Sequence, residues 1–93
     1  MIAPDTEWNR ALGRVIRRER EMIGVRQSDL SQEIGLGINS LGRLERGENS
    51  CYIHTLRAVA EGLQISIIDL ISATDREIER HRPRRTANST GSD

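Results

Sequence analysis

Residues 27–47, which read QSDLSQEIGLGINSLGRLERG, constrain the fold more than any other part of the chain. Two short stretches of this segment carry apolar residues three and four positions apart, which is the spacing of an amphipathic helix. Between them stands the tripeptide Gly-Leu-Gly at 35–37, and glycine readily adopts the backbone conformations of a tight turn. The second stretch ends at Gly47, a C-terminal helix signal. The segment therefore predicts two short helices joined by a sharp turn, with the second helix over 38–46.

Helical spacing continues on both sides of this segment. A first helix, closed by Gly24, is predicted by the apolar stripe of Trp8, Leu12, Val15, Ile16, Met22 and Ile23. A fourth is predicted by Ile53, Leu56, Val59, Ala60 and Leu63. A fifth starts at Ser66, because Asp69 three residues on completes a capping box. No strand pattern or internal repeat is present, so we expect an all-α fold of five helices.

The chain divides into one domain and a tail. Its 93 residues suffice for a single small domain, which we place at 1–73. Thr74 and Glu77 repeat the capping-box spacing, so a short C-terminal helix over 74–82 is expected, ending before Pro83. Residues 83–93 are too polar to build a core and are expected to be disordered.

Composition narrows the class of protein. A single cysteine, Cys51, leaves no internal disulfide, and there is neither a bilayer-length apolar run nor a signal-peptide pattern. We therefore expect a cytoplasmic protein. The 14 basic residues, all arginine, balance 14 acidic ones, but their distribution matters more than their sum. Arginines gather on the first helix, on the helix over 38–46 and at the C-terminal end, so nucleic acid is not excluded as a partner.

A family pattern runs through these helices. Its matching positions are Gln27, Leu30, Gly35, Leu41, Glu45, Gly47, Leu56, Ala60, Leu63 and Leu70. From Leu12 to about Leu70 the chain resembles the Cro and phage-repressor (XRE) family of helix-turn-helix DNA-binding domains. The resemblance implies a five-helix, phage-repressor-like fold. It also implies a transcription regulator, specific for double-stranded DNA sequence and acting as a dimeric repressor without a cofactor, whose helix over 38–46 enters the major groove.

The outward face of this helix suits base recognition. At about 100° per residue, Asn39 and Arg43 point away from the buried side, Ser40 lies on the flank, and Ile38 stands at the exposed N-terminal edge. Arg43 can bond to guanine, Asn39 to adenine, and Ile38 can touch a thymine methyl group. We expect these four residues to contact bases. Gly42, near the outer side, would let the helix approach closely. The alternative is an ordinary solvated polar face.

Phosphate contacts are expected beside this face. Gln27 begins the second helix, whose N-terminal amides carry partial positive charge, and the resemblance implies that its side chain clamps the DNA backbone. Arg46 flanks the recognition surface, and Asn49 and Ser50 follow in the loop where the family contacts the other strand. Glu48 departs from the family, which more usually has a basic residue there, and should weaken nonspecific binding.

A buried ion pair is expected between Arg20 and Glu45. Arg20 lies on the apolar stripe of the first helix, and Glu45 lies on the inward face of the third. A buried charge without a partner is costly, so the two should meet. The family resemblance implies the same bridge. A catalytic role for Glu45 is a poor alternative, because no second acid or base accompanies it.

The remaining reactive and aromatic residues give little indication of a further functional site. Cys51 and His54 have the spacing of two metal ligands, but no further ligands accompany them, so we expect no metal site. A thiol redox switch at Cys51 would require exposure. Trp8 and Tyr52 are too few for a platform that stacks single-stranded bases. No catalytic motif is present, and we expect no enzyme.

The fifth helix predicts self-association. Four isoleucines and a leucine lie within 65–71, more than one inward stripe can bury. The surplus, Ile68 and Ile71, would form an exposed patch that a second subunit covers in a homodimer. The alternative is that the segment after Thr74 folds back over it, with Ile78 as the one apolar residue available. Two other functions remain open: an antitoxin, whose protein partner would be a toxin, and a restriction-modification controller.

Overall fold

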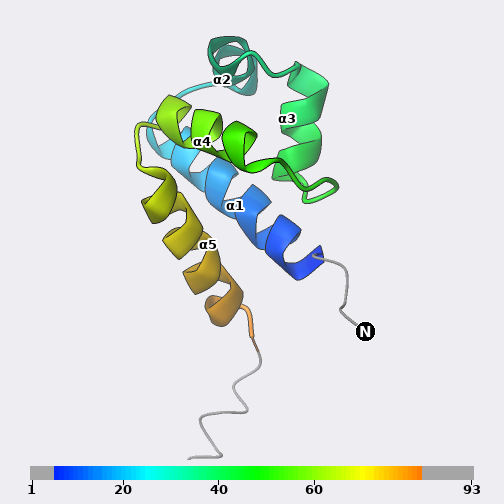
Figure 1. The fold of residues 1–93 in the computed structure, drawn as a ribbon, viewed down its shortest axis with the longest axis vertical. Helices are drawn as coiled ribbons and strands as arrows, with labels where there is room; N and C mark the ends of the chain where they lie inside the picture. The colour runs from blue at the N-terminus through cyan, green and yellow to red at the C-terminus, as the bar shows by residue number, and fades with distance from the viewer. Residues whose placement is uncertain (1–5, 83–93) are drawn as a thin grey trace, which may run out of the picture.

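The computed structural model describes residues 6–82. These residues form five helices, and no strand is present among them. The helices are α1 (Thr6–Met22), α2 (Gln27–Ile34), α3 (Ile38–Glu45), α4 (Ile53–Gly62) and α5 (Ile67–Arg80) (Figure 1). The expected all-α, five-helix fold is confirmed. Residues 1–5 and 83–93, including the tail expected to be disordered, lie outside the described residues.

Glycines end the first three helices, as the sequence predicts. Gly24, Gly35 and Gly47 have φ angles of 74°, 72° and 76°, a left-handed conformation that glycine adopts without a steric penalty. At Gly35 the backbone N–H turns back to the carbonyl of Gln32, and the N–H of Leu36 bonds to that of Ser31. These bonds close α2 tightly, so that only three residues separate the end of α2 from the start of α3.

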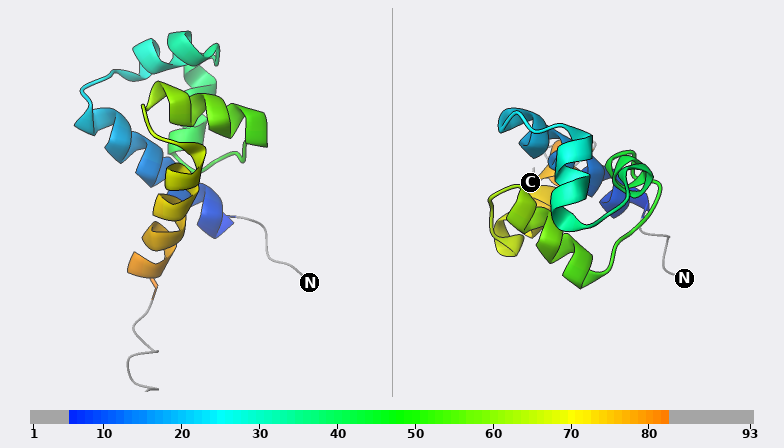
Figure 2. Two further views of the ribbon diagram at one scale, coloured as in Figure 1. Left: turned by 60° about the vertical axis from the view of Figure 1, so that its left-hand side comes forward. Right: turned by 90° about the horizontal axis from the view of Figure 1, so that it is seen from above.

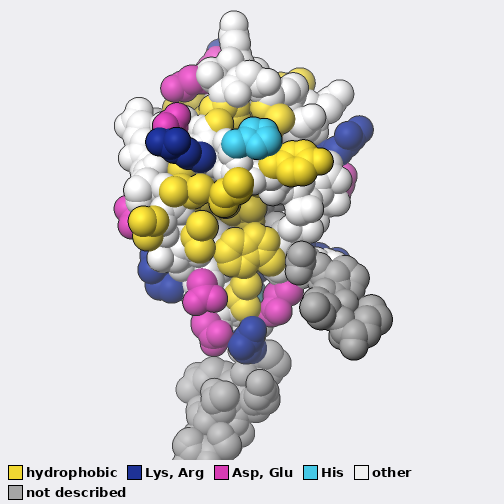
Figure 3. All heavy atoms as spheres, viewed as in Figure 1, with side chains coloured by type: hydrophobic (Ala, Val, Ile, Leu, Met, Phe, Trp, Pro, Cys, Tyr) yellow, Lys and Arg dark blue, Asp and Glu magenta, His cyan; other side chains and the backbone are white. Residues whose placement is uncertain are grey.

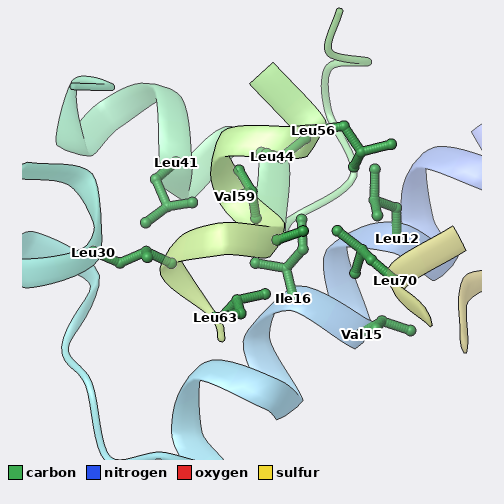
Figure 4. Close-up of a cluster of buried hydrophobic side chains, with 11 residues drawn as sticks. Leu12, Val15, Ile16, Leu30, Leu41, Leu44, Leu56, Val59, Leu63 and Leu70 are labelled. Atoms are coloured by element: carbon green, nitrogen blue, oxygen red, sulfur yellow. The ribbon is translucent and has the colours of Figure 1, made fainter. Parts of the chain in front are cut away.

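All five helices contribute to one apolar core. Its buried side chains include Leu12, Val15, Ile16, Leu30, Leu41, Leu44, Leu56, Val59, Leu63 and Leu70 (Figure 4). Burying a side chain of this size contributes about 1.5–3 kcal/mol. Met22, expected on the apolar stripe of α1, is instead 70% exposed. It follows Ile16 by six residues, which turns it about 120° away from the buried stripe.

The α1–α3 contact depends on a glycine. A Cβ atom on Gly13 would clash with the backbone carbonyl oxygens of Leu44 and Glu45. The last turn of α3 therefore lies directly on the backbone of α1. Because the opposite face of α3 is then the one left free, this contact decides which side chains of α3 reach solvent.

The C-terminal segment departs from expectation. Residues 74–80 continue α5 without a break instead of forming a separate short helix. Only Ser66 caps the helix, accepting a 3.0 Å hydrogen bond from the amide of Asp69. Thr74 lies in the middle of α5 and is buried, and its Oγ1 donates to the carbonyl oxygen of Leu70 at 2.8 Å. With neither glycine nor proline between Ser66 and Arg82, nothing interrupts the helix.

The α2–α3 pair and the end of α5 lie at opposite ends of the molecule (Figures 1 and 2). In both side views α2 is at the top and α5 extends downward, and in Figure 1 α4 lies in front of α1. None of the helices described has the length and apolar character needed to cross a membrane.

Candidate nucleic-acid interface

The outer face of α3 carries the four residues expected to contact bases. Asn39, Ser40 and Arg43 are exposed, and Ile38 is 49% exposed. The residues of the opposite face, Leu41, Leu44 and Glu45, are buried as expected. The helix is thus anchored on one side and offers polar and apolar groups that can read base edges on the other.

Gly42 is a correction to the expected face. It is buried, and a Cβ placed on it would lie 3.1 Å from Arg46 Nη1 and 4.0 Å from Gln27 Oε1. Gly42 therefore lies on the side of α3 that is nearest to α2, and not on the exposed outer face. The Arg46 guanidinium lies beside it, near the start of α2.

The end of α3 is fixed by a polar network. Arg20 donates to Glu45 through Nε at 2.7 Å and through Nη2 at 3.1 Å, and a further bond of 2.9 Å joins Nη1 to the carbonyl of Val25. The side chains of Arg20 and Glu45 are 11% and 3% exposed. The hydrogen bond to Glu45 outweighs burial and raises the pKa of Arg20 above its usual value. The expected ion pair is thus formed, and it connects α1 to α3.

Gln27 belongs to the same network. Its Nε2 donates a 2.8 Å hydrogen bond to Glu45 Oε1, although the family resemblance implies a phosphate contact for this side chain. An amide nitrogen has two N–H groups, so the second stays available to a phosphate oxygen. Neither Arg26 nor Gly37 caps its helix with a side chain, which leaves the first-turn amides of α2 and α3 free of that competitor.

The loop after α3 brings three expected contact residues together. Ser40, Asn49 and Ser50 line a pocket of about 200 Å³ at the junction of α3, the loop and the start of α4. Ser40 comes from the exposed face of α3, and Asn49 and Ser50 come from the loop. One surface therefore joins the expected base contacts to the expected phosphate contacts.

Two acidic residues pair with arginines in this region. Arg46 Nε lies 2.6 Å from Glu48 Oε2, and Arg26 Nε lies 3.2 Å from Asp29 Oδ2. Arg43 forms no ion pair within residues 6–82. The pairing of Glu48 with Arg46 was not predicted from the sequence, although their spacing of two residues is compatible with it.

A second ion cluster was missed entirely. The Glu77 carboxylate, 3% exposed, accepts hydrogen bonds from Arg14 Nε at 2.7 Å and Arg18 Nη1 at 2.9 Å, and Arg80 and His81 of its own helix end also contact it. Burial raises the pKa of Glu77, but the hydrogen bonds and charges of Arg18 and Arg14 outweigh it and bring the value to about 2. The cluster fastens α5 to α1, far from the α2–α3 pair.

Cys51 and His54 show no sign of a metal or redox site. Within the described residues no group of three or more His, Cys, Asp or Glu side chains could hold a metal ion. His54 instead stacks on Tyr52, with ring centroids 5.6 Å apart and planes 6° from parallel. Cys51 is half-buried, and burial raises the pKa of its thiol, which disfavours the reactive thiolate.

The expected surplus of apolar residues on α5 is present at the surface. Ile68 is 71% exposed and Ile71 is partly exposed, whereas Leu70 is buried. Ile78, the residue that could have covered this patch, is itself buried, and Ile68 remains exposed to solvent. Tyr52 and Ile53 at the start of α4 are also exposed, and Figure 3 shows hydrophobic side chains gathered on the face that carries α4 and α5.

Known structures share this arrangement. The regulator of clp genes ClgR from Corynebacterium glutamicum matches with a TM-score of 0.76 and 25% sequence identity, over 78% of this chain and 78% of that chain. The restriction-modification controller protein C.AhdI from Aeromonas hydrophila matches with a TM-score of 0.64 and 26% identity, over 66% of this chain and 92% of that chain.

A third structure has the same fold at lower identity. The restriction-modification controller protein C.Esp1396I, in a structure of its tetramer on a natural 35 base-pair operator, gives a TM-score of 0.71 at 24% identity. The match covers 77% of this chain and 95% of that chain. A search of curated protein sequences gave no significant match.

The family to which the chain belongs is shown by a sequence match over the helical core. The model of the helix-turn-helix family HTH_3 matches residues 16–70, from the middle of α1 into α5. This match spans more than half of the chain and includes the whole α2–α3 pair. The chain therefore belongs to the helix-turn-helix family, and it is a DNA-binding transcription regulator.

Proposed function

We propose that this regulator is a homodimeric, sequence-specific repressor that reads the major groove with α3. The observation that carries the proposal is the exposed face of α3, opposite the side locked by Glu45 and Gly13. Ile38, Asn39, Ser40 and Arg43 supply the base contacts, and rigid anchoring keeps them in register with the base edges.

Phosphate contacts flank these residues in the proposed complex. Gln27 contributes its free amide N–H and the N-terminal end of α2. Arg46 lies beside Gly42, next to Gln27, and Asn49 and Ser50 extend the surface along the other side of Ser40. Contacts of this kind fix the orientation of the protein on the duplex and are independent of sequence.

The dimer forms through α5 in this proposal, with Ile68 near the twofold axis and Ile71 beside it. Two observations support it: both isoleucines are exposed, and hydrophobic side chains gather on the face that carries α4 and α5 (Figure 3). The related fold of C.Esp1396I assembles as a tetramer on its operator. A dimer doubles the number of bases read, which a single helix needs in order to find one site in a genome.

The proposal places the protein in the cytoplasm, without a cofactor and without a catalytic role for any residue. Its direct test is selection of binding sites from random double-stranded oligonucleotides with the purified chain. We expect enrichment of a twofold-symmetric sequence with half-sites about one DNA turn, roughly 10 base pairs, apart. Recovery of unenriched sequences would overturn the proposal.

A narrower second candidate is control of a restriction-modification system. It is favoured by the structural match to C.AhdI, which reaches 26% identity over 92% of that chain. A neighbouring methyltransferase or endonuclease gene, with the selected site lying upstream of it, would support this candidate. A neighbouring toxin gene would instead favour the antitoxin alternative, which none of the structural matches cited above supports.

A further inference from the structure

Arg46 is held in place by its own chain. Its Nε lies 2.6 Å from Glu48 Oε2, and its guanidinium extends back along α3 to the space above Gly42. A Cβ atom at position 42 would lie 3.1 Å from Nη1, which places the Arg46 guanidinium directly beside Gly42. A cation beside the start of α2 is well placed to bind a phosphate oxygen. Here, however, the guanidinium of Arg46 already forms an ion pair with the carboxylate of Glu48.

The two arginines of this region, Arg43 and Arg46, differ in whether an acidic residue pairs with them. The hydrogen bond from Arg46 lowers the pKa of Glu48 below its usual value, and the nearby charge of Arg43 adds to this effect, so Glu48 is ionised at neutral pH. Arg43, by contrast, has no ion-pair partner among residues 6–82. The arginine expected at the bases is therefore free, whereas the arginine expected at the backbone carries a counter-charge.

We propose that Glu48 limits the sequence-independent part of DNA binding by competing with phosphate oxygens for Arg46. This inference rests on the proposed function and assigns a role to a residue outside the recognition face. Each phosphate neutralised by an arginine releases counterions and steepens the salt dependence of binding. An arginine already neutralised by Glu48 releases fewer, since it must first leave its intrachain partner. Glu48 thereby weakens the sequence-independent part of binding to the operator and to other DNA alike.

The fold does not depend on this pair. The side chains of Arg46 and Glu48 are 61% and 50% exposed, and exposed ion pairs contribute little to stability. Glu48→Gln, which keeps the shape and removes the charge, should therefore leave the folded structure intact. Arg57 and Glu61 on α4 form a similar exposed pair, 3.8 Å apart. Glu61→Gln is thus a control that changes the net charge by the same amount away from Arg46.

The experiment measures dissociation constants of the full chain for two duplexes of equal length, the selected operator and a scrambled sequence, by fluorescence anisotropy at 50 and 200 mM salt. We expect Glu48→Gln to bind both duplexes several-fold more tightly than the wild type. Engagement of one more phosphate steepens the salt slope by about 0.9, so the gain should be about 3.5-fold larger at 50 mM than at 200 mM salt. Glu61→Gln should show neither effect.

A double variant separates the mechanism from simple charge. In an Arg46→Gln background, Glu48→Gln should have no more effect than Glu61→Gln, because the residue that it restrains is absent. A gain that persists in that background, or equal gains for Glu48→Gln and Glu61→Gln, would overturn the inference. If the wild type binds neither duplex, the proposed function fails instead, and the two failures are distinct.

Discussion

Gln27 Nε2 and Glu45 Oε1, 2.8 Å apart, join the first residue of α2 to the last residue of α3. Glu45 also accepts two hydrogen bonds from Arg20 of α1. One buried carboxylate therefore ties three helices together and fixes the angle at which α3 leaves the core. The direction in which the exposed side chains of Arg43 and Asn39 point depends on this network, although neither residue belongs to it.

Removing this carboxylate should destabilise the fold. Glu45→Ala leaves Arg20 with an uncompensated charge at a site that is 11% exposed, and we expect a loss of about 3–5 kcal/mol in the free energy of unfolding. Urea denaturation measures it. A double replacement, Arg20→Met with Glu45→Leu, removes both charges and should cost much less. Equal stability of the wild type and Glu45→Ala would contradict the buried pair.

Gly13→Ala should also destabilise, against the trend for helices. Alanine inside a helix normally stabilises by up to about 1 kcal/mol relative to glycine, but here its Cβ meets the carbonyls of Leu44 and Glu45. We expect a net loss of about 1–3 kcal/mol in thermal or urea unfolding. Gly37→Ala is the control, since its Cβ would meet only Ser40 Oγ at 3.8 Å. A stabilised Gly13→Ala variant would show that α1 and α3 are not in close contact.

Glu77 should make stability depend on pH in the acid range. Its pKa of about 2 in the folded protein lies below the ordinary value of 4.5. A lowered pKa means that the folded state is favoured while the carboxyl is ionised, so the contribution is present above about pH 4.5 and is lost as the pH falls toward 2. The shift corresponds to about 3 kcal/mol.

Denaturation of wild type and Glu77→Gln at several pH values isolates this contribution from that of other carboxyls. The wild type should be more stable at pH 7, and the difference should vanish near pH 2. A difference that stays constant with pH would refute the assignment.

Much of this architecture could be predicted because local patterns determine it. Gly24, Gly35 and Gly47 end their helices where the sequence places them, and Ser66 caps α5. The partner of Arg20 could also be predicted, because two charges on facing apolar stripes leave one solution. The exposed face of α3 follows from periodicity once Leu41 and Leu44 are assigned to the core.

The rest required the tertiary fold. Glu77 meets Arg14 and Arg18 across about 60 residues of sequence, and nothing local distinguishes its carboxylate from the exposed acids around it. Thr74 has the spacing of a helix cap, but a threonine inside a continuous helix satisfies its hydroxyl by bonding to the carbonyl four residues earlier. Periodicity predicts Gly42 on the open side of α3, whereas in the structure α2 covers that flank.

The proposed dimer predicts a specific response to charge on α5. Ile68→Asp should give a folded monomer with weaker operator binding, because an ionised side chain at the interface would be buried without a partner. Sedimentation velocity measures the oligomeric state. Met22→Asp is a matched control, since Met22 is 70% exposed and Ile68 is 71% exposed but the two lie on different helices. A wild type that remains monomeric at high concentration would refute the dimer.

The most direct measurement of the central claim is the affinity of Arg43→Ala for the selected operator and for a scrambled duplex, compared with Gln27→Ala. We predict that Arg43→Ala loses about 1–3 kcal/mol on the operator, relaxes discrimination at one base pair and binds the scrambled duplex nearly as well as the wild type. Gln27→Ala should weaken binding to both duplexes alike. Unchanged operator affinity and selectivity in Arg43→Ala would contradict the assignment of α3 as the recognition helix.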